Sequence, residues 1–135
     1  MARAERIEGP MDWKEEYSVG DDQFDADHKK IFDMINELES ASDSERRPEF
    51  IELIFETLMD YTDDHFAREE QFMRDAGFAG VVEHHAKHAE MDEKLHGLFI
   101  RFRDGDRAVA GEVVEFLRQW WYVHILQEDM AYKKS

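Results

Sequence analysis

The sequence predicts an all-α protein, an up-down-up-down antiparallel four-helix bundle with an N-terminal arm. Apolar residues recur at alternating intervals of four and three along four stretches, which is the spacing of one helix face. Only 2 prolines and 7 glycines occur among 135 residues, and 37% of the residues are charged, as in helices with solvent-facing sides. Four helices of about 20 residues with short loops must run antiparallel to their neighbours, in a bundle about 30 Å long.

The first element is the arm. Residues 1–21 show no clear periodicity, but Trp13, Tyr17 and Val19 give them apolar content, so we expect this arm to pack on a bundle formed by residues 22–135. The first helix then presents one apolar face, made by Phe24, His28, Ile31, Ile35 and Leu38.

A polar stretch at residues 40–47 interrupts the pattern before the second helix. We expect Asp43 or Ser44 to cap that helix, whose first turn tolerates Pro48. We expect it to end at Gly77, because glycine is common just past a helix C-terminus. Its inward positions are Phe50, Ile54, Leu58, Tyr61, His65, Glu69 and Phe72.

The third and fourth helices follow with the same alternation. The third carries Val81, His84, His88, Met91, Leu95, Leu98 and Phe102. A short turn at residues 104–106 ends it, and the fourth carries Val109, Val113, Leu117, Trp120 and His124. No useful length of sequence alternates with period two, so a sheet is not expected.

Composition excludes several classes of function. The 33 acidic and 17 basic residues give a formal charge of −16, which repels phosphate backbones and anionic membranes. The absence of cysteine excludes disulfides, iron–sulfur clusters and thiol catalysis. The N-terminus has no apolar core of a signal peptide, and the longest apolar-rich run, residues 120–126, is too short to cross a bilayer. We therefore expect a soluble, cytoplasmic protein that binds no nucleic acid.

Nitrogen and oxygen donors fall on the inward stripes of all four helices. One histidine in such a stripe is usually a core residue with a hydrogen-bond partner. Burying five of them separately would need several unrelated partners in one small core, whereas a shared metal centre satisfies them together. The expected metal ligands are His28, His65, Glu69, His84, His88, His124 and Asp129.

The spacing of these donors supports a two-metal site. His84 and His88 lie one helical turn apart, and so do His65 and Glu69. His124 and Asp129 are five residues apart, about 140° around a helix, so they must straddle the centre or be brought together by a local distortion. Seven ligands exceed the need of one ion, and two carboxylates can bridge a pair.

Other polar residues are expected to be ordinary surface groups. His85 points about 100° away from His84, and His96 lies on nearly the same side as His85. We expect Asp63, Asp64 and Glu70 to belong to a solvated acidic face.

With these residues the sequence resembles the hemerythrin family, specifically its single-domain bacterial members, from Trp13 to the C-terminus. A family member is itself a standard example of the up-down-up-down bundle, so the expected fold is not independent of the resemblance. The motifs are Trp13 with residues 17–20, residues 25–28 with Ile35-Asn36, Tyr61-x-x-x-His65-Phe-x-x-Glu-Glu-x-x-Met73, His84-x-x-x-His88 and Trp120-x-x-x-His124-Ile-x-x-x-Asp129.

The resemblance implies two iron ions that bind dioxygen reversibly. His84, His88 and His124 would hold one iron, while His28 and His65 would hold the other and leave it an open place. Glu69, Asp129 and an oxo or hydroxo group would bridge the two ions. The residues beside the ligands, expected to line the oxygen pocket and equally consistent with ordinary core packing, are Ile31, Phe66, Trp120, Trp121 and Ile125.

Two departures from the family pattern concern the surroundings of the ligands. Asp27 stands where the family often has glutamine, which predicts a change in ligand orientation or basicity. Trp121 stands where a leucine commonly lines the oxygen pocket, and it precedes His124 by about one turn, which predicts a tighter pocket. The usual Tyr-Pro before the third helix is also absent, and Gly77-Phe78-Ala79 takes its place.

The favoured function is reversible dioxygen binding for storage, delivery or sensing, without catalytic turnover. The expected partners are dioxygen and a protein that receives it, and the expected oligomeric state is a monomer. A di-iron redox enzyme acting on oxygen, peroxide or nitric oxide, and an iron-handling protein, remain as alternatives.

Overall fold

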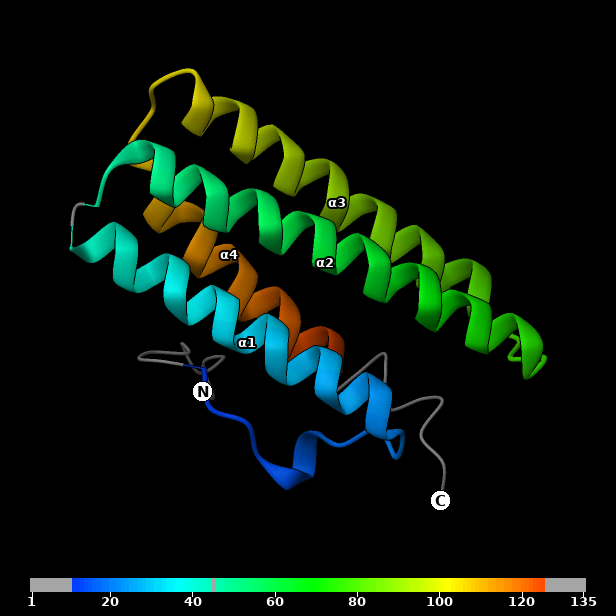
Figure 1. Ribbon diagram of the computed structural model, residues 1–135. Coiled ribbons are helices and arrows are strands. Elements are labelled where there is room, and N and C mark those ends of the chain that lie inside the picture. The colour runs from blue at the N-terminus through cyan, green and yellow to red at the C-terminus, as the bar shows by residue number, and fades with distance from the viewer. Residues whose placement is uncertain (1–10, 45, 126–135) are drawn as a thin grey trace, which may run out of the picture.

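A computed structural model, which describes residues 11–44 and 46–125, consists of four antiparallel helices (Figure 1). They are α1 (Asp22–Asp43), α2 (Pro48–Asp75), α3 (Val81–Arg103) and α4 (Val109–Val123), preceded by a short 3-10 turn, η1 (Glu15–Tyr17). Helix α1 packs against α2 and α4, and α3 packs against α2 and α4, so the four form a closed ring. No strand occurs in the described residues, and the all-α bundle predicted from the sequence is confirmed.

Local signals explain where the helices begin and end. The Asp21 carboxylate accepts a hydrogen bond from the Phe24 backbone N–H at 3.0 Å and caps α1. Helix α2 ends at Asp75, and Gly77 follows with a φ of 69°, a left-handed conformation that glycine adopts without strain. The predicted stop at Gly77 is confirmed.

The predicted cap of the second helix is wrong. Asp43 is the last residue of α1 and Ser44 its C-cap, while α2 begins at Pro48 after Arg47, which makes no side-chain cap. Helix α1 extends into the polar stretch as far as Asp43, and Ala41 in its last turn is buried against the core. Proline at the first position of α2 needs no N–H partner and sets the helical φ.

The described part of the N-terminal arm lies on α1. The Met11 backbone N–H donates to Asn36 Oδ1 at 2.7 Å, and Asn36 Nδ2 donates back to the Met11 carbonyl at 2.9 Å. Tyr17 and Val19 are buried, and the Val19 N–H donates to Asp25 Oδ1. These contacts fix the backbone immediately before α1 enters the bundle.

The core has an apolar half and a polar half. Ile35, Leu38, Phe55, Leu95 and Val109 are fully buried and fill the half near the α1–α2 connection. The histidines of the early part of α1, the late part of α2, the early part of α3 and the end of α4 all fall at the opposite end, because neighbouring helices are antiparallel.

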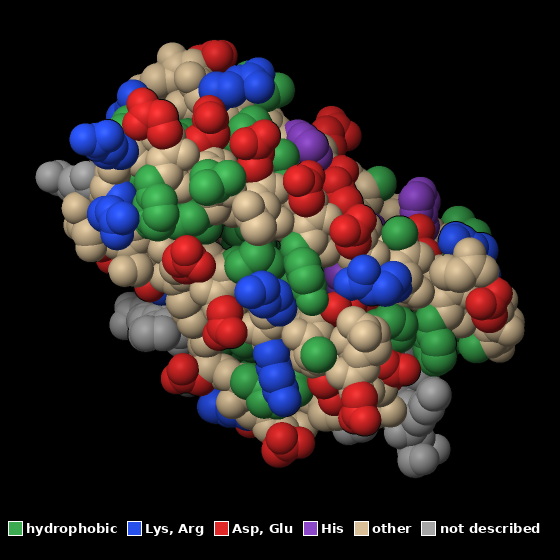
Figure 2. All heavy atoms as spheres, in the orientation of Figure 1, with side chains coloured by type: hydrophobic (Ala, Val, Ile, Leu, Met, Phe, Trp, Pro, Cys, Tyr) green, Lys and Arg blue, Asp and Glu red, His purple; other side chains and the backbone are tan. Residues whose placement is uncertain are grey.

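The outer surface of the bundle is predominantly acidic. Asp and Glu side chains are spread over the face seen in Figure 2, with Lys and Arg interspersed among them. Among the described residues, none of the helices combines the length and apolar character needed to cross a bilayer.

Candidate metal centre

Five histidine side chains surround one carboxylate in the polar half of the bundle. His28, His65, His84, His88 and His124 are at most 3% exposed, and Glu69 is fully buried among them. They come from all four helices. The structure therefore brings together six of the seven predicted ligands, and Asp129 lies outside the described residues.

One oxygen of Glu69 faces three histidines. The Oε1 atom lies 2.9 Å from His84 Nε2, 3.1 Å from His88 Nε2 and 3.9 Å from His124 Nε2. His88 Nε2 is 3.0 Å from His124 Nε2. These four donors are close enough together to ligate a single metal ion.

The other oxygen of Glu69 faces the remaining two histidines. The Oε2 atom lies 3.2 Å from His65 Nε2 and 4.0 Å from His28 Nε2. The two imidazole nitrogens are 3.1 Å apart. Glu69 thus stands between a three-histidine group and a two-histidine group, with one oxygen toward each.

The charge states of these groups suit metal ligation. Burial by itself would raise the pKa of Glu69, but hydrogen bonds from His124, His65, His84 and His88 hold that pKa well below its usual range. Burial lowers the pKa of His88 against the opposing effect of Glu69. An ionised carboxylate and a neutral imidazole are the forms that bind metals.

Asp27 contacts the two-histidine group at the ring nitrogen of His65 that faces away from Glu69. It is fully buried, and its Oδ2 lies 2.8 Å from His65 Nδ1. Tyr61 Oη donates to Asp27 Oδ1 at 2.9 Å, and Arg68 Nη2 lies 2.9 Å from the same oxygen. Burial opposes ionisation, but His65 and Arg68 hold the pKa of Asp27 far below its usual range. The carboxylate therefore fixes the His65 ring and increases its basicity.

The assignment of Glu70 to a solvated face is wrong. Glu70 is only 7% exposed, and its Oε2 lies 2.7 Å from His88 Nδ1. Its Oε1 contacts Nδ1 of His85, which is exposed as predicted. These hydrogen bonds lower the pKa of Glu70 although burial would raise it. Its partners belong to α3, so no spacing within the second helix could reveal the role.

We expect Asp27→Asn to weaken metal binding about 10- to 100-fold, because His65 loses its anionic partner. A competitive titration of ferrous iron against a coloured chelator, without air, measures the change. Asp64→Asn removes an exposed carboxylate from α2 and serves as the control. Equal affinities for the two variants would show that Asp27 does not support the site.

The predicted pocket residues separate into buried and half-buried groups. Trp121 is fully buried, with its ring centroid 5.8 Å from both His28 and His65. The Phe66 ring stacks on His88 at 3.7 Å. Ile31 and Ile125 are buried, while Trp120 is half-buried and stacks on His124. Trp120 is therefore closer to the surface than the other four.

A second, smaller group of possible donors lies outside the bundle core. Asp63, Asp92 and His96 approach one another across α2 and α3, with Asp63 and His96 exposed as predicted. Partial burial and a hydrogen bond with Asp92 raise the pKa of Asp63 to about 7.

This raised pKa predicts a pH-dependent cost to stability. Asp63 keeps its proton up to about pH 7 in the folded protein but loses it near pH 4 in the unfolded chain. Protonation of Asp63 therefore stabilises the folded state fully below about pH 4, and this contribution is lost as the pH rises through about 7. Asp63→Asn should therefore stabilise the protein at pH 8 by roughly 1 kcal/mol, allowing for solvent screening, and much less at pH 4. Thermal melts with a chelator present measure this, with exposed Asp33→Asn as control. An equal gain at both pH values would contradict it.

A four-helix bundle that gathers five histidines around one carboxylate defines a class of helical metal-binding proteins. The family model described as "Hemerythrin HHE cation binding domain" matches residues 19–134. The chain belongs to the hemerythrin family.

Known relatives cover most of the chain. It is 32% identical over 120 residues to a bacteriohemerythrin of Stenotrophomonas maltophilia, covering 89% of this chain and 77% of the relative. It is 27% identical to a hemerythrin-like protein of Naegleria gruberi, covering 96% and 97%. Crystal structures of hemerythrin with leucine replaced by tyrosine or alanine superpose with TM-scores of 0.85 and 0.84 at 29% identity, covering 91% of this chain and 94% of those.

Proposed function

We propose that this protein binds two iron ions and, through them, dioxygen reversibly, for storage, delivery or sensing. The observation that carries the proposal is the position of Glu69, whose two oxygens face two separate histidine groups. Such a carboxylate is placed to bridge two ions. Membership of the hemerythrin family supports iron as the metal.

The donor set fits this assignment. His84, His88 and His124 would hold one iron, and His28 and His65 the other. Imidazole nitrogen and carboxylate oxygen, without thiolate, suit iron. We assign the second bridging carboxylate to Asp129. Asp129 lies outside the described residues, and the family match over residues 19–134 includes it.

The surrounding residues favour binding without further reaction. An iron pair supplies reversible two-electron exchange with dioxygen when it is bound. The two-histidine group has fewer protein donors than its neighbour, so an iron held there by His28 and His65 would have room for dioxygen. Trp121 is fully buried beside His28 and His65, where its indole would restrict the access of water and anions.

Oxygen binding can be tested by reconstitution. The protein is loaded with ferrous iron without air, oxygen is admitted, and the visible spectrum is recorded before and after degassing. We expect an absorption band that appears with oxygen and disappears when oxygen is removed. Irreversible oxidation, or steady oxygen consumption with a reductant present, would overturn reversible binding and favour a redox enzyme.

A further inference from the structure

Two adjacent tryptophans near the end of α4 connect the candidate metal centre with the surface of the bundle. Trp121 is fully buried, and its ring centroid lies 5.8 Å from those of His28 and His65. Trp120 is half-buried, and its ring meets that of Trp121 edge to face, with the centroids 5.1 Å apart. The two indole rings therefore form a continuous path that leads outward from the two-histidine group.

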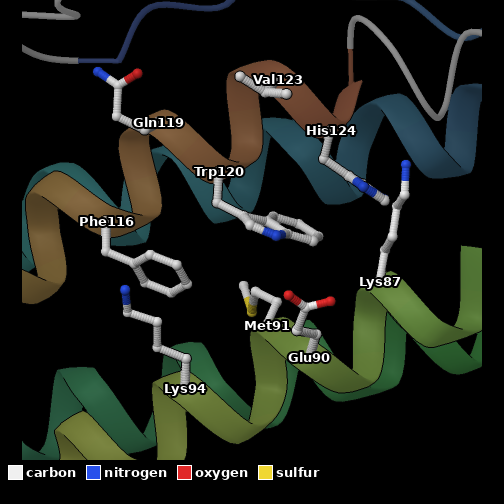
Figure 3. A pocket seen from close by; sticks show the side chains of 9 residues that line it. All are labelled: Lys87, Glu90, Met91, Lys94, Phe116, Gln119, Trp120, Val123 and His124. Atoms are coloured by element: carbon white, nitrogen blue, oxygen red, sulfur yellow. The ribbon is translucent and has the colours of Figure 1, made fainter.

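Trp120 is the outer end of this path. It lines a groove on the outside of the bundle between α3 and α4, and it projects from α4 toward Met91 of α3 (Figure 3). This outer groove has a volume of about 590 Å³, which is enough to hold water beside the indole. Trp120 also stacks on His124, with centroids 4.2 Å apart and an interplanar angle of 17°. It therefore joins a candidate ligand to the surface groove.

The chemistry of the indole ring suits the transfer of single electrons. Tryptophan is among the side chains that lose one electron most readily, and aromatic rings in contact exchange electrons faster than rings farther apart. The Nε1–H of Trp121 has no hydrogen-bond partner among the described residues. A Trp121 ring that has lost an electron therefore has no acceptor for its proton, and it takes an electron from Trp120 instead. Trp120 can release its own proton to water in the outer groove.

We propose that Trp121 and Trp120 carry electrons from the outer groove to the metal centre when hydrogen peroxide oxidises it, and so protect the buried histidines from oxidation. This inference rests on the proposed function, because bound iron supplies the reaction with peroxide. Trp120 is the source of the electrons, and Trp121 passes them on one at a time.

The reaction balances without a further reductant. Hydrogen peroxide takes two electrons and two protons and leaves as two molecules of water. Trp120 loses the two electrons, a water molecule of the outer groove adds a hydroxyl group to its ring, and two protons are released. The net reaction converts one peroxide and one tryptophan into one hydroxytryptophan and one water. Trp120 should therefore keep a covalent record of the electrons that it has supplied.

Peroxide treatment followed by peptide mass spectrometry tests the proposal. The iron-loaded protein is oxidised in air to the diferric state, desalted, assayed for iron and mixed with a small excess of hydrogen peroxide. We expect Trp120 to gain an oxygen atom several-fold more often than Trp13, and the two-histidine group to remain unmodified. Trp13 is a matched comparison because it is also half-buried but packs against Tyr17 and Phe32. In the metal-free protein, Trp120 and Trp13 should be oxygenated equally.

Variants distinguish a path through both tryptophans from simple exposure of one. Trp121→Phe keeps an aromatic ring in the core but removes the easily oxidised indole, so it should lower the oxygenation of Trp120 several-fold. Trp120→Phe should move the added oxygen onto Trp121 and the histidines beside it, whereas Trp13→Phe should change neither pattern. Circular dichroism and iron content confirm that each variant folds and binds iron.

Three results would overturn the proposal. They are equal oxygenation of Trp120 and Trp13 in the iron-loaded protein, equal oxygenation of Trp120 with and without iron, and unchanged oxygenation of Trp120 in Trp121→Phe. The proposed oxygen binding is judged separately, because a reversible visible band in the same preparation supports it whatever the pattern of oxygenation. A chain that binds no iron would overturn both.

Discussion

Replacing Glu69 with glutamine is expected to reduce bound iron from two ions per chain to one or none. The two carboxylate oxygens face different histidine groups, at 2.9 Å from His84 and 3.2 Å from His65. A glutamine amide keeps the shape but carries no charge, and it presents one acceptor oxygen and one donor nitrogen. It can therefore ligate on one side only. Iron per chain, measured after anaerobic loading and desalting, gives the result.

A matched control separates this role from a general loss of negative charge. Glu90→Gln removes an exposed carboxylate from the outer groove, away from the centre of the histidine cluster, and should leave two ions bound. The Glu69 variant should remain helical without metal, because the amide still has hydrogen-bonding neighbours in the same cavity. Two ions bound as tightly as in the unaltered protein would show that Glu69 is not a bridge.

The fold could be predicted from the sequence because helix faces are recorded in the spacing of residues on a single element. Apolar positions such as Ile35, Leu58 and Leu95 recur with helical period and are fully buried. The polar composition of residues 40–47 predicts an earlier break than the structure shows. Burial of Ala41 against the core, a tertiary contact, extends α1 beyond that point.

Ligands that share a helix can be predicted from their spacing, whereas supporting residues that contact them from another helix cannot. His84 and His88 share one helix face, so their spacing alone indicates a common target. Glu70 binds His88 from another helix, and Asp27 binds His65 from another helix. Such pairs have no fixed separation in sequence. In the sequence, Asp27 is distinguished only by its departure from the family pattern, and Glu70 has no distinguishing signal.

Replacing Trp121 with leucine is expected to open the two-histidine side of the centre to water and small anions. The indole is fully buried, and its ring centroid lies 5.8 Å from His28 and from His65. A leucine fills only part of that volume. We expect faster azide binding and faster irreversible oxidation by air, each by about tenfold, a difference of about 1.4 kcal/mol in barrier height. Stopped-flow spectroscopy of the iron-loaded protein measures both rates.

The same position should contribute strongly to stability. Removing a buried aromatic side chain leaves a cavity, so Trp121→Ala should cost roughly 3–5 kcal/mol of unfolding free energy and Trp121→Leu less. The indole Nε1 has no hydrogen-bond partner among the described residues, so Trp121→Phe removes an unsatisfied donor and should be the mildest change. Urea unfolding measures the free energy of unfolding of the three variants and tests this order.

Trp120→Leu serves as the control for Trp121→Leu. Trp120 is half-buried and lines a surface groove between α3 and α4. Its replacement should therefore cost less stability than replacement of Trp121 and should leave azide access to the two-histidine side unchanged. Equal azide rates in Trp121→Leu and the unaltered protein would show that the indole does not restrict access to the two-histidine side. If instead Trp120→Leu accelerated azide binding as much as Trp121→Leu, small molecules would reach the centre between α3 and α4, past His124. Both tryptophans would then restrict access to the centre.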